Sequence, residues 1–130
     1  MRKIEKKIIK IMRECLDGKR PAGVYALTKR DKVELLKGSV RYVLWGSVIF
    51  KATKCTSYTR LEFSDNGYNT RTTHSRLKAL AVEFIAPYDS LCVKGGFLCK
   101  KYGRNTARFC DLSNRNIFEI GENYFRQMEE

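Results

Sequence analysis

Residues 60–84, RLEFSDNGYNTRTTHSRLKALAVEF, decide the fold of this chain. Polar and apolar side chains alternate at the start of the stretch, which is the pattern of a half-buried strand. Ser64 to Gly67 form a turn signal, because Asp and Asn favour turns and Gly67 tolerates positive φ. After the turn, apolar residues recur at the spacing of one helix face: Leu77, Leu80, Ala81 and Phe84. The pattern therefore predicts a strand over 56–63, a turn, and a helix.

The predicted helix has signals at both ends. Thr73 or Ser75 is the expected N-cap, because a side-chain oxygen there accepts a hydrogen bond from an unpaired amide of the first turn. Pro87 is expected to end the helix, since proline lacks the amide hydrogen that a helix interior needs. Together they predict a helix of about three turns that begins near 73–75.

The start of this helix also predicts an anion site, because the first amides have no internal partner and the helix dipole is positive there. Basic side chains would add charge-assisted hydrogen bonds, and hydroxyls would add neutral ones. The candidate anion-binding residues are Arg71, Thr72, Thr73, Ser75 and Arg76. In the alternative interpretation the hydroxyls only cap the helix, and Arg76 pairs with Glu62 or Asp65 inside the fold.

Residues 2–17 predict an amphipathic helix that ends at Gly18. One stripe is apolar and consists of Ile4, Ile8, Ile11, Met12, Cys15 and Leu16. The basic side chains fall largely on the other faces, and those predicted to contact phosphates are Lys3, Lys6, Lys7, Lys10 and Arg13. A solvated face that binds nothing is the alternative.

Two β-hairpins are predicted on either side of the central helix. In residues 39–50 apolar side chains alternate before Trp45-Gly46 and an apolar run resumes after it, so the chain is expected to turn near Gly46. In residues 91–99 two short apolar runs flank Gly95-Gly96. Both patterns predict antiparallel pairing.

Three other segments have weaker patterns. Residues 18–38 predict a loop, with a short helix at 31–37 as the alternative, because breakers and charged residues interrupt them. Residues 105–116 predict a loop. Residues 118–128 predict a short strand and a terminal helix.

These elements predict a single α+β domain over residues 1–130. A mostly antiparallel sheet of about five strands packs with the N-terminal amphipathic helix and the central helix. Residues 39–99 would form the β-rich core, and residues 100–130 a C-terminal extension.

The chain is strongly basic, with 26 Lys and Arg against 14 Asp and Glu and a net charge of +12. The excess is largest in residues 1–37, where 12 basic residues accompany 5 acidic ones. A basic protein of this size attracts polyanions, and nucleic acid is the most abundant of them in a cell. The composition therefore predicts nucleic acid (DNA or RNA) or a nucleoprotein complex as the partner.

Aromatic side chains are interleaved with basic ones along the predicted strands. A sheet face that carries both would suit stacking on single-stranded nucleic acid, whereas buried aromatics would belong to the core. The side chains concerned are Tyr42, Trp45, Phe50, Tyr58 and Tyr68.

Motifs for catalysis or cofactor binding are missing. His74, the single histidine, has hydroxyl and arginine neighbours in sequence rather than an acid, and there is no phosphate-binding loop. A zinc site from His74, Cys92, Cys99 and Cys110 lacks ligands paired closely in sequence. We therefore expect no enzyme, no catalytic residues, no metal and no cofactor.

The five cysteines are an odd number without a C-x-x-C pair, which predicts free, mostly buried thiols in a reducing compartment. Charges interrupt the first residues before an apolar signal region can form, and no apolar run approaches the roughly 20 residues that span a bilayer. We expect the protein to stay where it is made and to have no membrane partner.

Residues 63–80 resemble a segment of small, mostly uncharacterised proteins of tailed bacteriophages. In these a hairpin leads through G-[WY]-x-T-x-T-T-x-S-R-L-x-A-L into a helix. The matching positions here are Gly67, Tyr68, Thr70, Thr72, Thr73, Ser75, Arg76, Leu77, Ala79 and Leu80. The first five residues are also similar, while residues 19–38 and those after Lys100 depart from the compact version. The resemblance implies a viral protein in the host cytoplasm and no particular activity.

These features predict a non-enzymatic phage accessory protein that binds nucleic acid or a nucleoprotein complex, mainly through phosphate contacts. One alternative is an inhibitor of a host protein complex, such as a polymerase or, like an anti-CRISPR protein, a defence nuclease. Another is a minor virion or assembly protein. The oligomeric state is left open.

Overall fold

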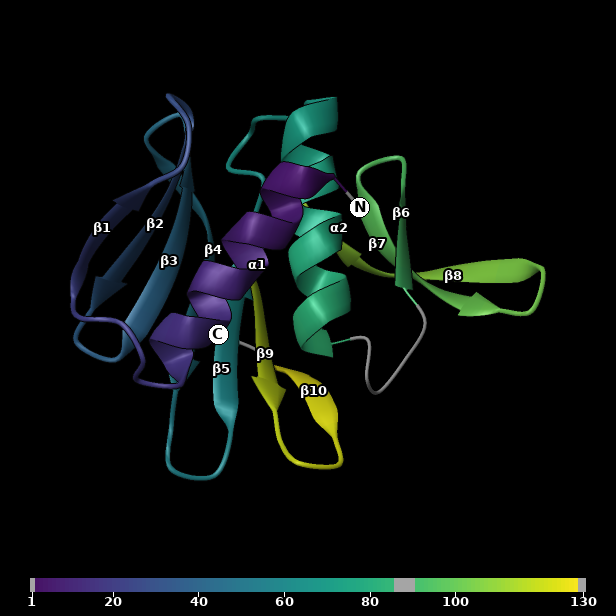
Figure 1. Cartoon of the computed structure of the whole chain (residues 1–130). Helices are drawn as coiled ribbons and strands as arrows, with labels where there is room; N and C mark the ends of the chain where they lie inside the picture. The colour runs from purple at the N-terminus through teal and green to yellow at the C-terminus, as the bar shows by residue number, and fades with distance from the viewer. Residues whose placement is uncertain (1, 86–90, 129–130) are drawn as a thin grey trace.

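The structure is a computed structural model that describes residues 2–85 and 91–128 (Figure 1). In these residues two helices, α1 (Lys3–Leu16) and α2 (Arg71–Ile85), accompany ten strands. The strands form a seven-stranded sheet and a three-stranded sheet, both antiparallel. The predicted α+β class is confirmed, but there are more strands than predicted.

The large sheet is a five-stranded meander with two strands added at one edge. The meander consists of β1 (Gly23–Ala26), β2 (Asp31–Leu36), β3 (Ser39–Leu44), β4 (Ser47–Lys54) and β5 (Thr59–Phe63). After β5 the chain forms α2 and the small sheet, then returns to the large sheet as β9 (Asn116–Ile120) and β10 (Phe125–Met128). The small sheet consists of β6 (Leu91–Lys94), β7 (Phe97–Tyr102) and β8 (Asn105–Asp111).

The predicted strand–turn–helix unit forms, but its strand begins at Thr59 and not at Thr56, and its helix begins at Arg71 and not near 73–75. β5 leads into a turn in which Gly67 has a φ of +82°, and α2 follows. The hairpins near Gly46 and at Gly95-Gly96 are confirmed as β3–β4 and β6–β7. Pro87, the predicted end of the helix, lies outside the described residues.

Three segments predicted as loop or helix form strands. Residues 18–38 contain β1 and β2, and a helix at 31–37 is wrong because alternate side chains, Asp31, Val33 and Leu35, are buried along β2. Residues 105–116 contain β8, and residues 118–128 contain β10 in place of a terminal helix. β8 and β10 are mostly exposed and are held by backbone pairing with β7 and β9. Because they bury few side chains, their sequences carry no alternating apolar pattern that would predict a strand.

A row of phenyl rings crosses the large sheet in its core. The rings of Phe50, Phe63 and Phe118, from β4, β5 and β9, have centroids 5.5 and 5.7 Å apart. Phe84 of α2 packs on Phe50 at 5.5 Å. All four are buried, so the end of α2 is anchored over the middle of the sheet.

α1 and α2 lie next to each other on one face of the large sheet, and the small sheet lies beyond α2 (Figure 1). Ser75 Oγ donates a hydrogen bond to Glu5 Oε2 at 2.6 Å near the start of both helices. Arg13 pairs with Glu83 at 3.1 Å near their ends. The two helices therefore run in the same direction.

A buried arginine joins both helices to the sheet. Arg76 has no exposed surface, and its Nη1 lies 2.9 Å from Glu5 Oε2 of α1. Its Nε lies 3.0 Å from Asp31 Oδ1 of β2, which also accepts the hydroxyl hydrogen of Tyr42 of β3. Arg76 is thus inside the fold, as in the alternative interpretation, but Glu62 and Asp65 are not its partners.

The charged form of Asp31 is stabilised by these contacts. Burial by itself would raise the pKa of the Asp31 carboxyl. Hydrogen bonds from Thr28, Tyr42 and Arg76, with the charge of the guanidinium, outweigh burial and hold this pKa below its ordinary value. The contribution of Asp31 to stability therefore depends on its ionisation.

Arg76→Ala is expected to lower the free energy of unfolding by about 3–5 kcal/mol, because it leaves buried Glu5 without a cation and buried Asp31 with only the more distant Arg30, at 3.5 Å. Arg71→Ala is the matched control: it removes an exposed guanidinium from the same helix and should change this free energy little. Urea unfolding followed by circular dichroism measures both. Equal losses in the two variants would contradict the structural role of Arg76.

Asp31 also predicts acid-sensitive stability. Its pKa is lower in the folded chain than in the unfolded one, where it is about 3.9. The stabilisation is therefore complete above that value and is lost as the pH falls through the folded pKa. Below about pH 4 the free energy of unfolding should fall more steeply in the wild-type protein than in Asp31→Asn. Urea titrations at several pH values test this, and parallel profiles would speak against it.

Candidate functional site

The basic residues predicted on α1 lie on its solvent side. Ile8, Met12 and Cys15 are buried, and the apolar stripe faces the core. The side chains predicted to contact phosphates are all exposed: Lys3, Lys6, Lys7, Lys10 and Arg13. The amphipathic pattern therefore places these cations where a ligand can reach them.

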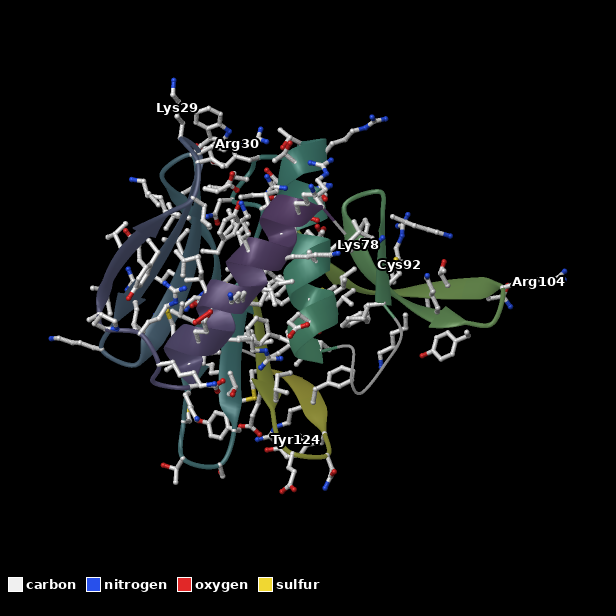
Figure 2. The ribbon with its side chains drawn as sticks, viewed as in Figure 1. Lys29, Arg30, Lys78, Cys92, Arg104 and Tyr124 are labelled. Atoms are coloured by element: carbon white, nitrogen blue, oxygen red, sulfur yellow. The ribbon has the colours of Figure 1, made fainter. Side chains whose placement is uncertain are left out.

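α2 adds Arg71 in its first turn and Lys78 two turns later, both exposed. Figure 2 shows Lys78 on the solvent side of this helix. Because α1 and α2 run alongside each other, their cations share one surface, which we call the helical basic face. It consists of Arg2, Lys3, Lys6, Lys7, Lys10, Arg13, Arg71 and Lys78.

Acidic side chains neutralise little of the helical basic face. Arg13 pairs with Glu83 at 3.1 Å, and Glu5 is buried against Arg76. The other seven members form no ion pair with a described residue. They are Arg2, Lys3, Lys6, Lys7, Lys10, Arg71 and Lys78. The face therefore presents an uncompensated positive charge to solvent.

A groove of ≈ 630 Å³ opens at the start of α2. Arg2, Arg71 and Lys78 line it, and Gly95 and Gly96 of the β6–β7 turn also border it. A second hollow of ≈ 500 Å³ adjoins it along α1 and α2 and shares Arg2 and Lys78 with it. The starts of both helices thus meet at a hollow with three basic side chains.

The hydroxyls predicted as anion ligands mostly have internal partners. Thr70 Oγ1 accepts the Thr73 amide hydrogen at 3.1 Å, so Thr70 caps α2 and the prediction of Thr73 or Ser75 as N-cap is wrong. Thr73 is buried, and its hydroxyl bonds that of Thr70 at 2.9 Å. Ser75 Oγ donates to Glu5. Of the predicted hydroxyls, only that of Thr72 has no hydrogen bond within the described residues.

The structure divides the predicted anion-binding residues of α2 between core and surface. Arg76 is enclosed by its two carboxylate partners, so it does not reach the face that an external anion would meet. Arg71 is exposed, and Thr72 is half-buried. Of the five residues, Arg71, Thr72 and Ser75 reach the surface, and Ser75 lines both hollows although its hydroxyl hydrogen is donated to Glu5.

His74 has an acidic neighbour in space that its sequence neighbours do not reveal. Its Nε2 lies 3.2 Å from Asp65 Oδ2, and Asp65 Oδ1 accepts the Gly67 amide hydrogen at 3.0 Å. Asp65 is buried and His74 is half-buried. The pair ties the turn after β5 to the first turns of α2.

The aromatic side chains predicted to stack separate into two groups. Tyr42 and Phe50 are fully buried, and Tyr58 is half-buried. Trp45 and Tyr68 are 67% and 52% exposed. Both exposed rings lie beside the start of α2, where they line one hollow with Thr70 and Thr72. Sequence alternation did not separate these groups, because the two exposed rings lie in turns outside the strands.

All five cysteines are free, as predicted. Burial raises the pKa of the Cys110 thiol to about 12, which keeps it protonated at neutral pH. Within residues 2–85 and 91–128, no group of three His, Cys, Asp or Glu side chains is placed to hold a metal ion. Neither helix in these ranges has the length and apolar character needed to cross a membrane.

No protein-family model, curated protein or solved structure matches the chain. The resemblance of residues 63–80 to proteins of tailed bacteriophages stays a prediction.

Thr70→Ala is expected to lower the free energy of unfolding by about 1 kcal/mol, because the Thr73 amide loses its cap. Thr72→Ala removes a neighbouring hydroxyl that has no internal partner, so it should have a much smaller effect. Thermal and urea unfolding of both variants test the assignment. A larger loss in Thr72→Ala than in Thr70→Ala would show that the cap is misplaced.

Proposed function

We propose that this protein binds nucleic acid, free or within a nucleoprotein complex, through phosphate contacts made by the helical basic face. The observation that carries the proposal is the row of exposed cations on two parallel helices, of which Arg13 alone forms an ion pair within the described residues. Lysine and arginine contacts to phosphates hold a protein on nucleic acid without reading its bases. In this proposal the protein is a non-enzymatic accessory protein, and its phage origin rests on the sequence resemblance alone.

The direction of the helices supports a phosphate ligand. α1 and α2 run in the same direction, so the positive ends of both helix dipoles lie at one end of the pair. The groove at that end carries Arg2, Arg71 and Lys78. Dipoles and side-chain charges therefore attract an anion to the same place.

The opposite face of the large sheet is electrostatically different. Its outward side chains include three acids, each directly opposite a base on the neighbouring strand. These register pairs are Glu34 with Arg41, Lys51 with Glu62, and Arg60 with Glu119. Opposite charges on neighbouring strands attract one another, and Glu62 and Glu119 form ion pairs with two further bases of this face, Arg115 and Arg126. This favours the helical basic face as the side that meets a polyanion.

The proposal predicts a steep dependence of binding on salt. Each neutralised phosphate contributes about 0.9 to the slope of log K against log salt for duplex DNA and about 0.7 for a single strand. Lys6→Gln/Lys10→Gln should therefore lower this slope by about 1.4–1.8 and weaken binding at low salt. Fluorescence anisotropy with labelled DNA and RNA oligonucleotides, at several salt concentrations, measures both quantities.

Lys32→Gln/Lys51→Gln is the matched control, because it removes the same charge from the opposite face of the sheet. It should leave the slope close to the wild-type value. Equal changes in the two double variants would show that only net charge matters. Absence of binding to every oligonucleotide at low salt would reject the proposed function.

A further inference from the structure

A small hollow next to the start of α2 is walled by the two exposed aromatic rings. Its volume is ≈ 210 Å³, below the roughly 300–1,000 Å³ of sites that enclose drug-sized ligands. Trp45 and Tyr68 line it together with Leu44, Ile49, Thr70, Thr72 and Thr73. Leu44 and Ile49 are buried, so the hollow has an apolar floor, and the hydroxyls of three threonines lie beside it. Its size and lining suit one flat ring.

Trp45 occupies a backbone position that a bulky residue disfavours. It has a φ of +50° and precedes Gly46, at +78°, in the two-residue turn between β3 and β4. Turns with positive φ at both central residues favour Asn, Asp or Gly at the first. The Trp45 amide donates to Arg30 O at 2.8 Å, which holds the turn in place. Neither burial nor local propensity explains an indole here, whereas a ligand for its exposed face does.

Basic side chains lie at the same end of the molecule as the hollow (Figure 2), although none of them lines it. Lys29 and Arg30, in the turn between β1 and β2, lie at the end of the molecule where α2 begins (Figures 1 and 2). Arg71 follows Thr70, which lines both this hollow and the basic groove. A chain of phosphates on the helical basic face would therefore pass next to the two rings.

We infer that Trp45 and Tyr68 receive one unstacked base of a single-stranded nucleic acid, whose neighbouring phosphates lie on the helical basic face. The inference rests on the proposed function and deepens it by naming the class of nucleic acid. A base presents a flat π-face to the indole, and its polar edge meets hydroxyls such as that of Thr72. Such stacking tolerates any base sequence, because every base has a π-face.

The same geometry disfavours a duplex. In a double helix the bases are stacked and paired, and moving one into a pocket requires unstacking and unpairing it. A single strand lacks pairing and offers its bases more readily. Single-stranded oligonucleotides should therefore bind more tightly than a duplex of the same sequence.

Trp45 provides a direct measurement, because it is the only tryptophan in the chain. Its intrinsic fluorescence is recorded while the protein is titrated with a single strand of about 12 nucleotides. A strand of the same length with abasic sites throughout supplies the phosphates without the bases. We expect the normal strand to quench the fluorescence, and the abasic strand to bind by anisotropy without quenching it.

Tyr68→Ala and Tyr102→Ala form a matched pair, since both remove an exposed tyrosine and Tyr102 lies on β7 of the small sheet. Tyr68→Ala should weaken binding of the normal strand about 5- to 150-fold and leave binding of the abasic strand unchanged. Tyr102→Ala should change neither. Trp45→Phe should retain more affinity than Trp45→Ala, because phenylalanine still stacks. Circular dichroism confirms that each variant is folded.

The possible outcomes separate this inference from the proposed function. If no oligonucleotide binds at low salt, both are rejected. If normal and abasic strands bind equally with the expected salt dependence and without quenching, the phosphate contacts stand and the base site is rejected. Fluorescence that responds to a protein in nuclease-treated lysate, but to no oligonucleotide, would assign the two rings to a protein interface and overturn the inference.

Discussion

The arrangement of the two helices depends on the buried guanidinium of Arg76. A buried charge is tolerated only when it is paired and hydrogen-bonded, and Arg76 finds these partners in Glu5 of α1 and Asp31 of β2. These contacts set the start of α1 beside the start of α2. With the apolar stripes and Glu5 turned inward, the lysines of α1 have only the solvent side left. The same internal contacts therefore organise the external charge.

Neighbouring residues of similar chemistry have opposite roles in this fold. Arg71 and Arg76 are separated by five positions, which turns them to different sides of α2, so one is exposed and the other is fully enclosed. Tyr42 and Trp45 differ likewise, because one lies on a core-facing position of β3 and the other in the following turn. In our account the enclosed member of each pair maintains the fold, and the exposed member meets the ligand.

Local patterns predicted α1, the strand–turn–helix unit and two hairpins, since each is encoded by residues close together in sequence. The partners of Arg76 could not be predicted, because they lie 71 and 45 positions away and no periodicity relates them to it. β8 and β10 were not predicted, because they are held mainly by pairing with a neighbouring strand and bury few side chains. β2 is a different case. Val33 and Leu35 alternate with polar residues as in a strand, but the charged residues around them favoured the prediction of a loop. The exposed cations of the proposed site could be predicted from composition and helix period. That Trp45 and Tyr68 line the same hollow could be seen only in the folded structure.

The central claim is that a polyanion meets the helix pair and not the opposite face of the sheet. The most direct test is the map of backbone amide chemical-shift changes when isotope-labelled protein is titrated with a single-stranded oligonucleotide. Our account predicts changes concentrated in α1, the first turns of α2 and the adjoining turns at residues 45–46 and 95–96. Changes centred on the outward residues of β3, β4 and β5, with the helices unaffected, would contradict it.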